Sequence, residues 1–265
     1  VNVSDIAAMN GFAEQITVSL ALSNRFSLEA IDAFYEGVKA ACDAYKVDLV
    51  GGDTTASPSG LMISVTAIGK VDKDKIAYRS GAKVNDIVCV TGDLGGAYMG
   101  LQVLEREKQV YLENPDMQPQ LDKYQYIVGR QLKPEARMDL VHELLDLKIV
   151  PTSMIDISDG LASELHHIAK HSDVGINVHE DKLPFATNTQ ETALEFKLDP
   201  NTAILNGGED YELLFTISQD DFEKVKNHPD IHFIGYINEK SSGLNLVTTK
   251  GNPIPLKAQG WDHFS

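Results

Sequence analysis

Apolar residues recur along this chain with two different periods, and segments of the two kinds follow one another from end to end. Residues 16–20 alternate between apolar and polar side chains as a strand does, whereas between Ser27 and Tyr45 apolar residues recur as on one face of a helix. Ser27 stands where a side chain caps the first turn of a helix. Because strands and helices are mixed throughout, the pattern predicts an α/β or α+β fold.

The same two periods predict the other elements and a boundary between two domains. Strands are expected at 61–71, 87–91, 154–156, 174–178, 212–217, 231–237 and 244–248. Helices are expected at 4–13, 96–106, 123–132, 135–148, 189–197 and 220–227, and another ends near His171. Residues 107–122 are polar and are expected to be irregular. Another polar stretch separates residues 1–82, an expected N-terminal α/β domain, from residues 83–265, an expected C-terminal α+β domain.

The charge of the chain limits its partners. It has 39 acidic and 23 basic residues, which give a formal net charge of −16 at pH 7. Binding to nucleic acid or docking on an anionic membrane depends on basic patches, so both are excluded as functions. A small anionic ligand is compatible with this charge if divalent cations lie between the ligand and the carboxylates.

Cysteine use and hydropathy point to the cytoplasm. Cys42 and Cys89 are far apart in sequence and are predicted to be buried small residues of a reduced protein. No apolar stretch approaches the roughly 20 residues of a membrane span, and no signal segment opens the chain. Because the chain begins at Val1 rather than at a methionine, we expect that an N-terminal portion is missing.

Four short clusters combine acidic residues with Gly, Ser or Thr. They are Asn2-Val3-Ser4-Asp5, Gly51-Gly52-Asp53-Thr54-Thr55, Asp156-Ile157-Ser158-Asp159-Gly160 and Gly207-Gly208-Glu209-Asp210-Tyr211. Each alone fits an ordinary structural role: the first and third as helix caps, the second as a turn after a strand, and the fourth as a tight loop. Together they fit a binding site, because carboxylates are ligands of Mg²⁺ and glycines let backbone N–H groups approach phosphate oxygens.

Other signatures of nucleotide, metal or nucleophile sites are missing from the sequence. It contains neither G-x-x-x-x-G-K-[ST] nor G-x-G-x-x-G, and the glycine spacing in residues 91–96 favours helix packing over dinucleotide binding. His167 and His171 are four residues apart without an H-E-x-x-H pattern, so with His166 they indicate an exposed helix face. A G-x-S-x-G nucleophile signature is also absent.

At the four clusters the sequence resembles the thiamine-monophosphate kinase family, whose superfamily includes aminoimidazole ribonucleotide synthetase and selenophosphate synthetase. The resemblance covers nearly the whole chain and rests on residues 2–9, 49–55, 155–161 and 207–215 and on the ending Gly260-Trp261-Asp262-His263-Phe264. It implies the two-domain α/β (α+β) fold of that superfamily and a homodimer. In the family an N-terminal segment supplies further metal and phosphate ligands, so the N-terminal domain is expected to be incomplete here.

The resemblance implies transfer of the γ-phosphoryl group of ATP to thiamine monophosphate, which gives thiamine diphosphate. The acceptor is a phosphate that is largely ionised at neutral pH, so no general base is needed and no catalytic side chain of that kind is expected. The difficulty is to bring two polyanions together in line. Positioning and several Mg²⁺ ions would address that difficulty.

The resemblance also implies roles for individual residues. Metal ligands are expected at Asp5, Asp53, Asp156 and Asp159. Contacts to ATP are expected from Tyr35, Gly52, Asp53, Arg79 and Ser158. Contacts to thiamine monophosphate are expected from Glu209, which the resemblance favours over Asp210, and from Trp261, whose ring face attracts a cation such as thiazolium. The ordinary alternatives are a solvated loop charge for Arg79 and packing against the domain for Trp261.

Two other functions stay open at the level of sequence. The first is another ATP-dependent enzyme of the superfamily that acts on a different phosphate or amide acceptor, although the ending around Trp261 argues against it. The second is a protein that binds nucleotide or thiamine phosphate without catalysis. A substrate screen with ATP distinguishes the first alternative, and calorimetry that shows binding of ATP and thiamine phosphate without turnover would favour the second.

Overall fold

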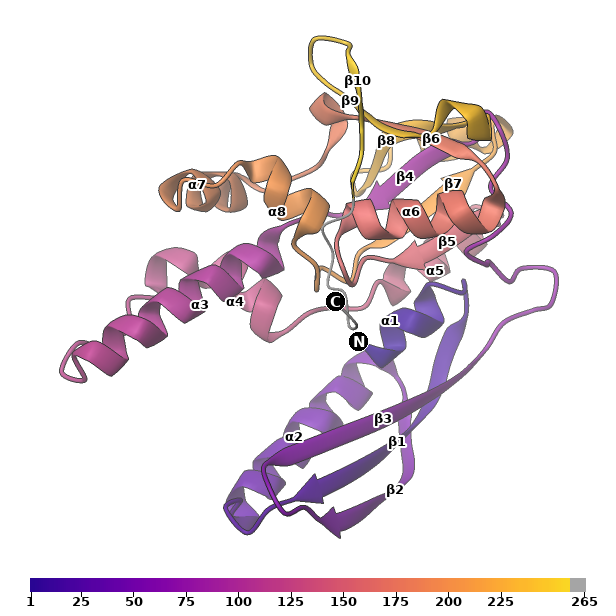
Figure 1. Ribbon diagram of the computed structural model, residues 1–265. Coiled ribbons are helices and arrows are strands. Elements are labelled where there is room, and N and C mark those ends of the chain that lie inside the picture. Colours follow the sequence, from indigo (N-terminus) through magenta and orange to yellow (C-terminus); the bar gives the residue numbers. More distant parts are fainter. Residues whose placement is uncertain (258–265) are drawn as a thin grey trace.

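The computed structural model describes residues 1–257, which form two sheets with their covering helices (Figure 1). The smaller sheet has the strand order β2-β1-β3 and comes from the N-terminal part of the chain. Its elements are α1 (Asn2–Ala7), β1 (Phe12–Leu22), α2 (Leu28–Tyr45), β2 (Asp48–Ala56) and β3 (Leu61–Lys70). Strand β1 pairs parallel with β2 and antiparallel with β3.

One face of the smaller sheet packs on α2. Ile16, Val18 and Leu20 alternate along β1 onto this face and form a small core with half-buried apolar residues of α2. The predicted cap of α2 is confirmed, because the backbone N–H of Ala30 donates a hydrogen bond of 3.3 Å to Ser27 Oγ. Every residue of the edge strand β2 is exposed.

The larger sheet has the strand order β10-β9-β6-β8-β4-β7-β5. Its strands are β4 (Ile87–Thr91), β5 (Ser153–Asp156), β6 (Gly175–His179), β7 (Leu213–Ile217), β8 (Ile231–Asn238), β9 (Leu244–Val247) and β10 (Pro253–Pro255). Its α-helices are α3 (Gly96–Glu113), α4 (Gln125–Leu132), α5 (Met138–Asp146), α6 (Leu161–Ser172), α7 (Thr187–Glu195), α8 (Pro200–Asn206) and α9 (Phe222–Val225). Neighbouring strands are antiparallel except β6 and β9, which are parallel. In the described part of the chain, no helix is both long and apolar enough to cross a membrane.

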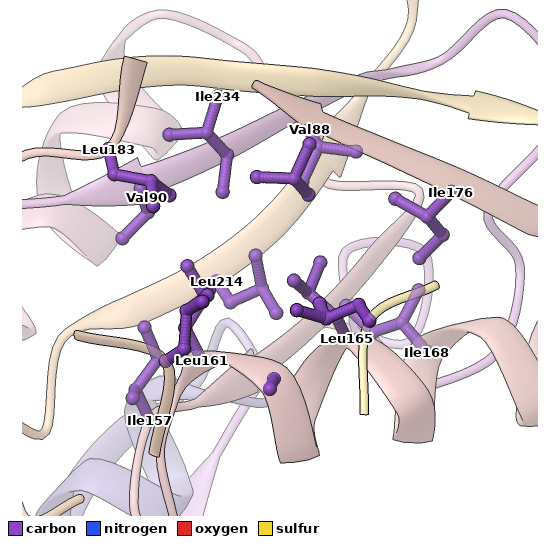
Figure 2. Close-up of a cluster of buried hydrophobic side chains, with 14 of the residues drawn as sticks. Val88, Val90, Ile157, Leu161, Leu165, Ile168, Ile176, Leu183, Leu214 and Ile234 are labelled. Atoms are coloured by element: carbon purple, nitrogen blue, oxygen red, sulfur yellow. The ribbon is translucent and has the colours of Figure 1, made fainter. Parts of the chain in front are cut away.

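Helix α6 covers one face of the larger sheet and closes the main core (Figure 2). Leu161, Leu165 and Ile168 point from α6 toward Val88 on β4 and Leu214 on β7. All five side chains are excluded from solvent. The spacing of the three helix residues is the 3.6-residue period that the sequence displays.

A second core cluster joins the two parts of the chain. Leu140 and Leu144 of α5 pack with Phe215, which points to the opposite face of the sheet from Leu214. Ala7 and Ala8, at the end of α1, belong to the same cluster. The N-terminal helix is therefore packed against the larger sheet as well as against its own.

We expect Leu165→Ala to lower the free energy of unfolding by about 2–5 kcal/mol, because it leaves a cavity in a core that has little room to collapse. Leu112→Ala on α3 is the matched control, since Leu112 is 62% exposed. It should change stability by less than about 0.5 kcal/mol. Urea unfolding followed by circular dichroism measures both. Equal losses in the two variants would contradict the burial of Leu165.

The ordinary structural roles considered for the first three clusters are wrong. Residues 51–53 lie inside β2 and not in a turn. Gly52 pairs with Val18, and a Cβ at residue 52 would lie 1.9 Å from the Val18 carbonyl oxygen, so only glycine fits. The side-chain caps predicted from the first and third clusters are also absent. The N-cap of α1 is Val1 and that of α6 is Gly160, and neither helix has a side-chain cap.

Other differences concern element lengths and burial. The first helix ends at Ala7 and not near residue 13, and α3 continues to Glu113 through part of the stretch expected to be irregular. The sequence patterns missed α8 and β10. Cys89 is buried as predicted, whereas Cys42 is only half-buried.

Candidate active site

The first and third clusters meet where α1 passes the end of β5. Ser4 is fully buried, and its Oγ donates a hydrogen bond of 2.7 Å to Oδ2 of Asp156, the last residue of β5. The exposed Asp5 follows on the same helix, and its negative charge acts on Asp156. Ser4 therefore joins the N-terminal helix to the larger sheet instead of capping α1.

A pocket of about 420 Å³ lies beside these two carboxylates. Its charged and polar lining includes Asp5, Asp156, Arg79 and His171. Its apolar lining consists of Ala8, Met9, Ala77, Met154 and Ile155. Arg79 is exposed, and its positive charge acts on Asp156. Two carboxylates and a guanidinium beside an apolar wall suit a ligand that has both an ionic and an apolar part.

Burial raises the pKa of Asp156 above its usual value. The hydrogen bond from Ser4 opposes this shift, the negative charge of Asp5 adds to it, and the positive charge of Arg79 opposes it. The ionised form of Asp156 is thus destabilised in the folded protein. A cation placed between Asp5 and Asp156 would remove that penalty.

The raised pKa of Asp156 predicts a pH dependence of stability. The native state keeps a proton that the unfolded chain loses above the ordinary pKa of 3.8, so the contribution of Asp156 falls as pH rises through this interval. Asn at position 156 can still accept the Ser4 hydrogen bond but does not ionise. Without divalent cations, the wild-type free energy of unfolding should fall relative to that of Asp156→Asn as the pH rises above the ordinary pKa of 3.8. Urea unfolding at a series of pH values tests this, and parallel pH profiles would contradict it.

The third and fourth clusters are tied together by their backbones. Ser158 O accepts a hydrogen bond of 2.8 Å from Glu209 N, and Ile157 O accepts one of 2.9 Å from Tyr211 N. Gly208 makes this approach possible: its φ is +93°, and a Cβ there would lie 2.5 Å from the Ser158 carbonyl oxygen. The two segments, separated by about 50 residues of sequence, thus form one surface at the end of the larger sheet.

Tyr211 lies among the acidic residues of three clusters. Only 7% of the residue is exposed, and its φ of +53° is rare for a side chain of this size. Burial raises the pKa of its phenol to about 12, and four carboxylates add to the shift: Glu209, Asp156, Asp5 and Asp159. The first, third and fourth clusters therefore converge on a single region of negative charge. An unusual backbone angle at such a place is common in functional sites.

Glu164, which sequence reasoning missed, holds the loop of the third cluster. Its Oε1 accepts hydrogen bonds from the backbone N–H of Ser158 at 3.0 Å and of Asp159 at 2.8 Å. The residue is buried, and burial raises its pKa. Its position in the sequence could have revealed it, because Glu164 is an acidic residue on the apolar helix face that Leu161 and Leu165 define.

Glu209 and Asp210 have different environments. Glu209 is exposed and accepts a hydrogen bond of 2.7 Å from Gln131 Nε2 on α4. Asp210 is buried and accepts hydrogen bonds from the backbone N–H groups of Gly95 at 2.7 Å and Ala97 at 3.3 Å. Burial raises the pKa of Asp210 to about 7, although these bonds oppose the shift. Asp210 thus anchors the start of α3, and Glu209 is the residue of the two that a ligand can reach.

Sequence reasoning also missed a buried network behind the fourth cluster. Glu212 accepts hydrogen bonds from Arg130 Nη1 at 2.9 Å, Arg137 Nη1 at 2.7 Å and Thr91 Oγ1 at 2.5 Å. Arg137 continues the network to Asp230. These contacts join α4, the start of α5 and strands β4 and β7 beneath the loop that carries Glu209.

The remaining expected site residues lie elsewhere. Tyr35 is half-buried on α2, with its ring 5.3 Å from that of Phe34 in an edge contact. Gly52 and Asp53 lie on β2, in the other sheet from Asp156. Trp261 lies outside the described residues. Within residues 1–257, no three His, Cys, Asp or Glu side chains lie close enough together to form a preformed metal site.

Family models match both parts of the chain. The model for "AIR synthase related protein, N-terminal domain" matches residues 1–71, and the model for "AIR synthase related protein, C-terminal domain" matches residues 83–243. Thiamine-monophosphate kinase from Bacillus subtilis is 36% identical over 271 residues, which cover 100% of this chain and 79% of that protein. The protein of the same name from Escherichia coli K12 is 33% identical, with 100% and 78% covered.

Solved structures give the same grouping. A structure described as "AaThiL complexed with AMPPCP and TMP" matches with a TM-score of 0.84 at 32% identity, over 99% of this chain and 77% of that one. Thiamine monophosphate kinase from Aquifex aeolicus matches with a TM-score of 0.80 at 31% identity, over 96% and 79%. The hydrogenase maturation protein HypE from E. coli, at 16% identity and a TM-score of 0.76, shares the fold.

Proposed function

The chain belongs to the thiamine-monophosphate kinases of the AIR synthase related family, and from this premise we propose how its residues transfer the γ-phosphoryl group of ATP to thiamine monophosphate. The observation that carries the proposal is the convergence of Asp5, Asp156 and Asp159 near Tyr211, beside a pocket lined by Arg79. A concentration of carboxylates next to one guanidinium fits the binding of phosphates through divalent cations.

The donor set fits Mg²⁺. The carboxylates of Asp5 and Asp156 flank one pocket, and the penalty for ionising Asp156 there is one that a cation would relieve. We propose that Asp5, Asp53, Asp156 and Asp159 bind several Mg²⁺ ions when ATP is present. Bound Mg²⁺ neutralises the charge of the phosphates and of the transition state.

The chain's own side chains position the two substrates. Arg79 pairs with ATP phosphates, the Ser158 hydroxyl lies beside ATP, and Gly52 and Tyr35 lie along the nucleotide. Glu209 and Trp261 hold the thiamine moiety. No general base acts, because the acceptor phosphate is already largely ionised at neutral pH. Rate enhancement then comes from alignment and from electrostatic stabilisation.

We place the domain boundary after residue 82, with ATP bound mainly by residues 1–82 and thiamine monophosphate mainly by residues 83–265. The two sheets and the separate family matches support this division. We propose a cytoplasmic homodimer. Large apolar residues exposed on the smaller sheet support a partner there: Leu49, Val50, Leu61, Met62 and Ile63.

Purified full-length protein with ATP, thiamine monophosphate and Mg²⁺ tests the function. Thiamine diphosphate and ADP should form in equal amounts, as separated by chromatography, and a chelator should stop the reaction. Transfer to another acceptor in place of thiamine monophosphate would indicate a different activity of the superfamily. Calorimetric binding of both substrates without product would indicate a sensor.

A further inference from the structure

We propose that Glu164 is a positioning residue whose buried carboxylate fixes the loop that presents Ser158 and Asp159 to the phosphates. This inference rests on the kinase function proposed above. It assigns Glu164 no contact with a substrate. Its effect reaches the reaction only through the loop.

The contacts of Glu164 are concentrated on that loop. One oxygen, Oε1, accepts from Ser158 N at 3.0 Å, Asp159 N at 2.8 Å and Ser158 Oγ at 3.3 Å. Hydrogen bonds from N–H groups to a carboxylate are roughly twice as strong as those between neutral groups. Glu164 is 1% exposed, a costly position for a carboxylate, and these bonds to Oε1 offset part of that cost.

Backbone contacts hold the loop from the other side. Ser158 O accepts from Glu209 N, and Ile157 N donates to Glu212 O, both at 2.8 Å. These contacts occupy the carbonyl side of Ser158 and leave the N–H groups of Ser158 and Asp159 to Glu164. Removal of the Glu164 carboxylate would therefore free two consecutive peptide units at the residues proposed to bind ATP and metal.

Two variants of Glu164 separate the carboxylate from the space that it fills. In Glu164→Gln, the amide oxygen can still accept both backbone hydrogens, whereas Glu164→Ala removes the acceptor. Ile168→Ala is the matched control, because Ile168 is fully buried on the same helix and packs in the core away from the loop. All three are made in the full-length protein.

Hydrogen exchange of the Ser158 and Asp159 amides is the first readout. Exchange should accelerate by about tenfold or more in Glu164→Ala and stay near the wild-type rate in Glu164→Gln and Ile168→Ala. The second readout is steady-state kinetics. In Glu164→Ala, kcat should fall by about 10- to 100-fold, because the loop would no longer hold Ser158 and Asp159 in line with the phosphates. Half-maximal activity should also need more Mg²⁺, because Asp159 is a proposed metal ligand. Ile168→Ala should lower Tm without changing the Mg²⁺ requirement.

The outcomes are distinct from those of the proposed function. Unchanged exchange in Glu164→Ala would overturn the inference, as would equal losses in Glu164→Ala and Glu164→Gln. A shift of the Mg²⁺ requirement in Ile168→Ala equal to that in Glu164→Ala would show a merely structural role and would also overturn it. If the wild-type protein makes no thiamine diphosphate, the proposed function fails, and the exchange data still decide whether Glu164 holds the loop.

Discussion

Asp53→Ala is expected to reduce thiamine diphosphate formation from ATP and thiamine monophosphate by about a thousandfold, to near background. The reason is electrostatic: the variant removes one carboxylate from the set proposed to hold Mg²⁺ against the phosphates. Asp53 lies exposed on β2, in register with Ser19 of β1. Within the described residues, its carboxylate has no hydrogen bond or ion pair that the change would break. The fold should therefore be unaffected.

Asp48→Ala is the matched control for this prediction. Asp48 is exposed and is the first residue of the same strand, so both variants change the net charge of β2 equally. Initial rates at saturating and at limiting Mg²⁺, together with thermal unfolding curves, separate loss of a metal ligand from loss of structure. Full activity in Asp53→Ala, or an equal loss of activity in Asp48→Ala, would contradict the assignment of Asp53 as a metal ligand.

The elements with one clear period could be predicted from the sequence. The α2 pattern and its Ser27 cap, and the apolar run of β4, are local signals that no distant contact overrides. Strand β2 could not be predicted through Gly51 and Gly52, since glycine disfavours strands. Its extension there depends on pairing with β1, in which Gly52 lies against the Val18 carbonyl.

The candidate site also has parts that could be predicted from the sequence and parts that could not. The four acidic clusters could be recognised in the sequence, because residue type alone suggests metal and phosphate binding. Which groups meet depends on tertiary structure: Ser4 bonds to Asp156 across 152 residues instead of capping its own helix. Glu164 and Glu212 were missed because a glutamate in the sequence looks solvated until its partners are known. Sequence reasoning thus found the clusters but not the buried groups that hold them.

Glu212 differs from Glu164 in having two arginines as partners. Its side chain is 3% exposed and has three partners, which are Arg130, Arg137 and Thr91. The side chains of the two arginines are themselves only 19% and 12% exposed. Removing the carboxylate would leave both guanidinium groups poorly solvated and without their central counter-charge. Removing one partner of a buried ion pair lowers stability by far more than the intact pair contributes.

We therefore expect Glu212→Ala to lower the free energy of unfolding by about 3–5 kcal/mol. Glu195 offers a close control, because it also binds two cations and a hydroxyl, those of Arg106, Lys123 and Tyr124. Its side chain is 34% exposed, so water can replace these contacts, and Glu195→Ala should cost about 1 kcal/mol or less. Urea unfolding of both variants measures the difference. Similar losses would mean that burial does not set the cost of removing a carboxylate, and that the network beneath Glu209 does not stabilise the fold more than a surface cluster does.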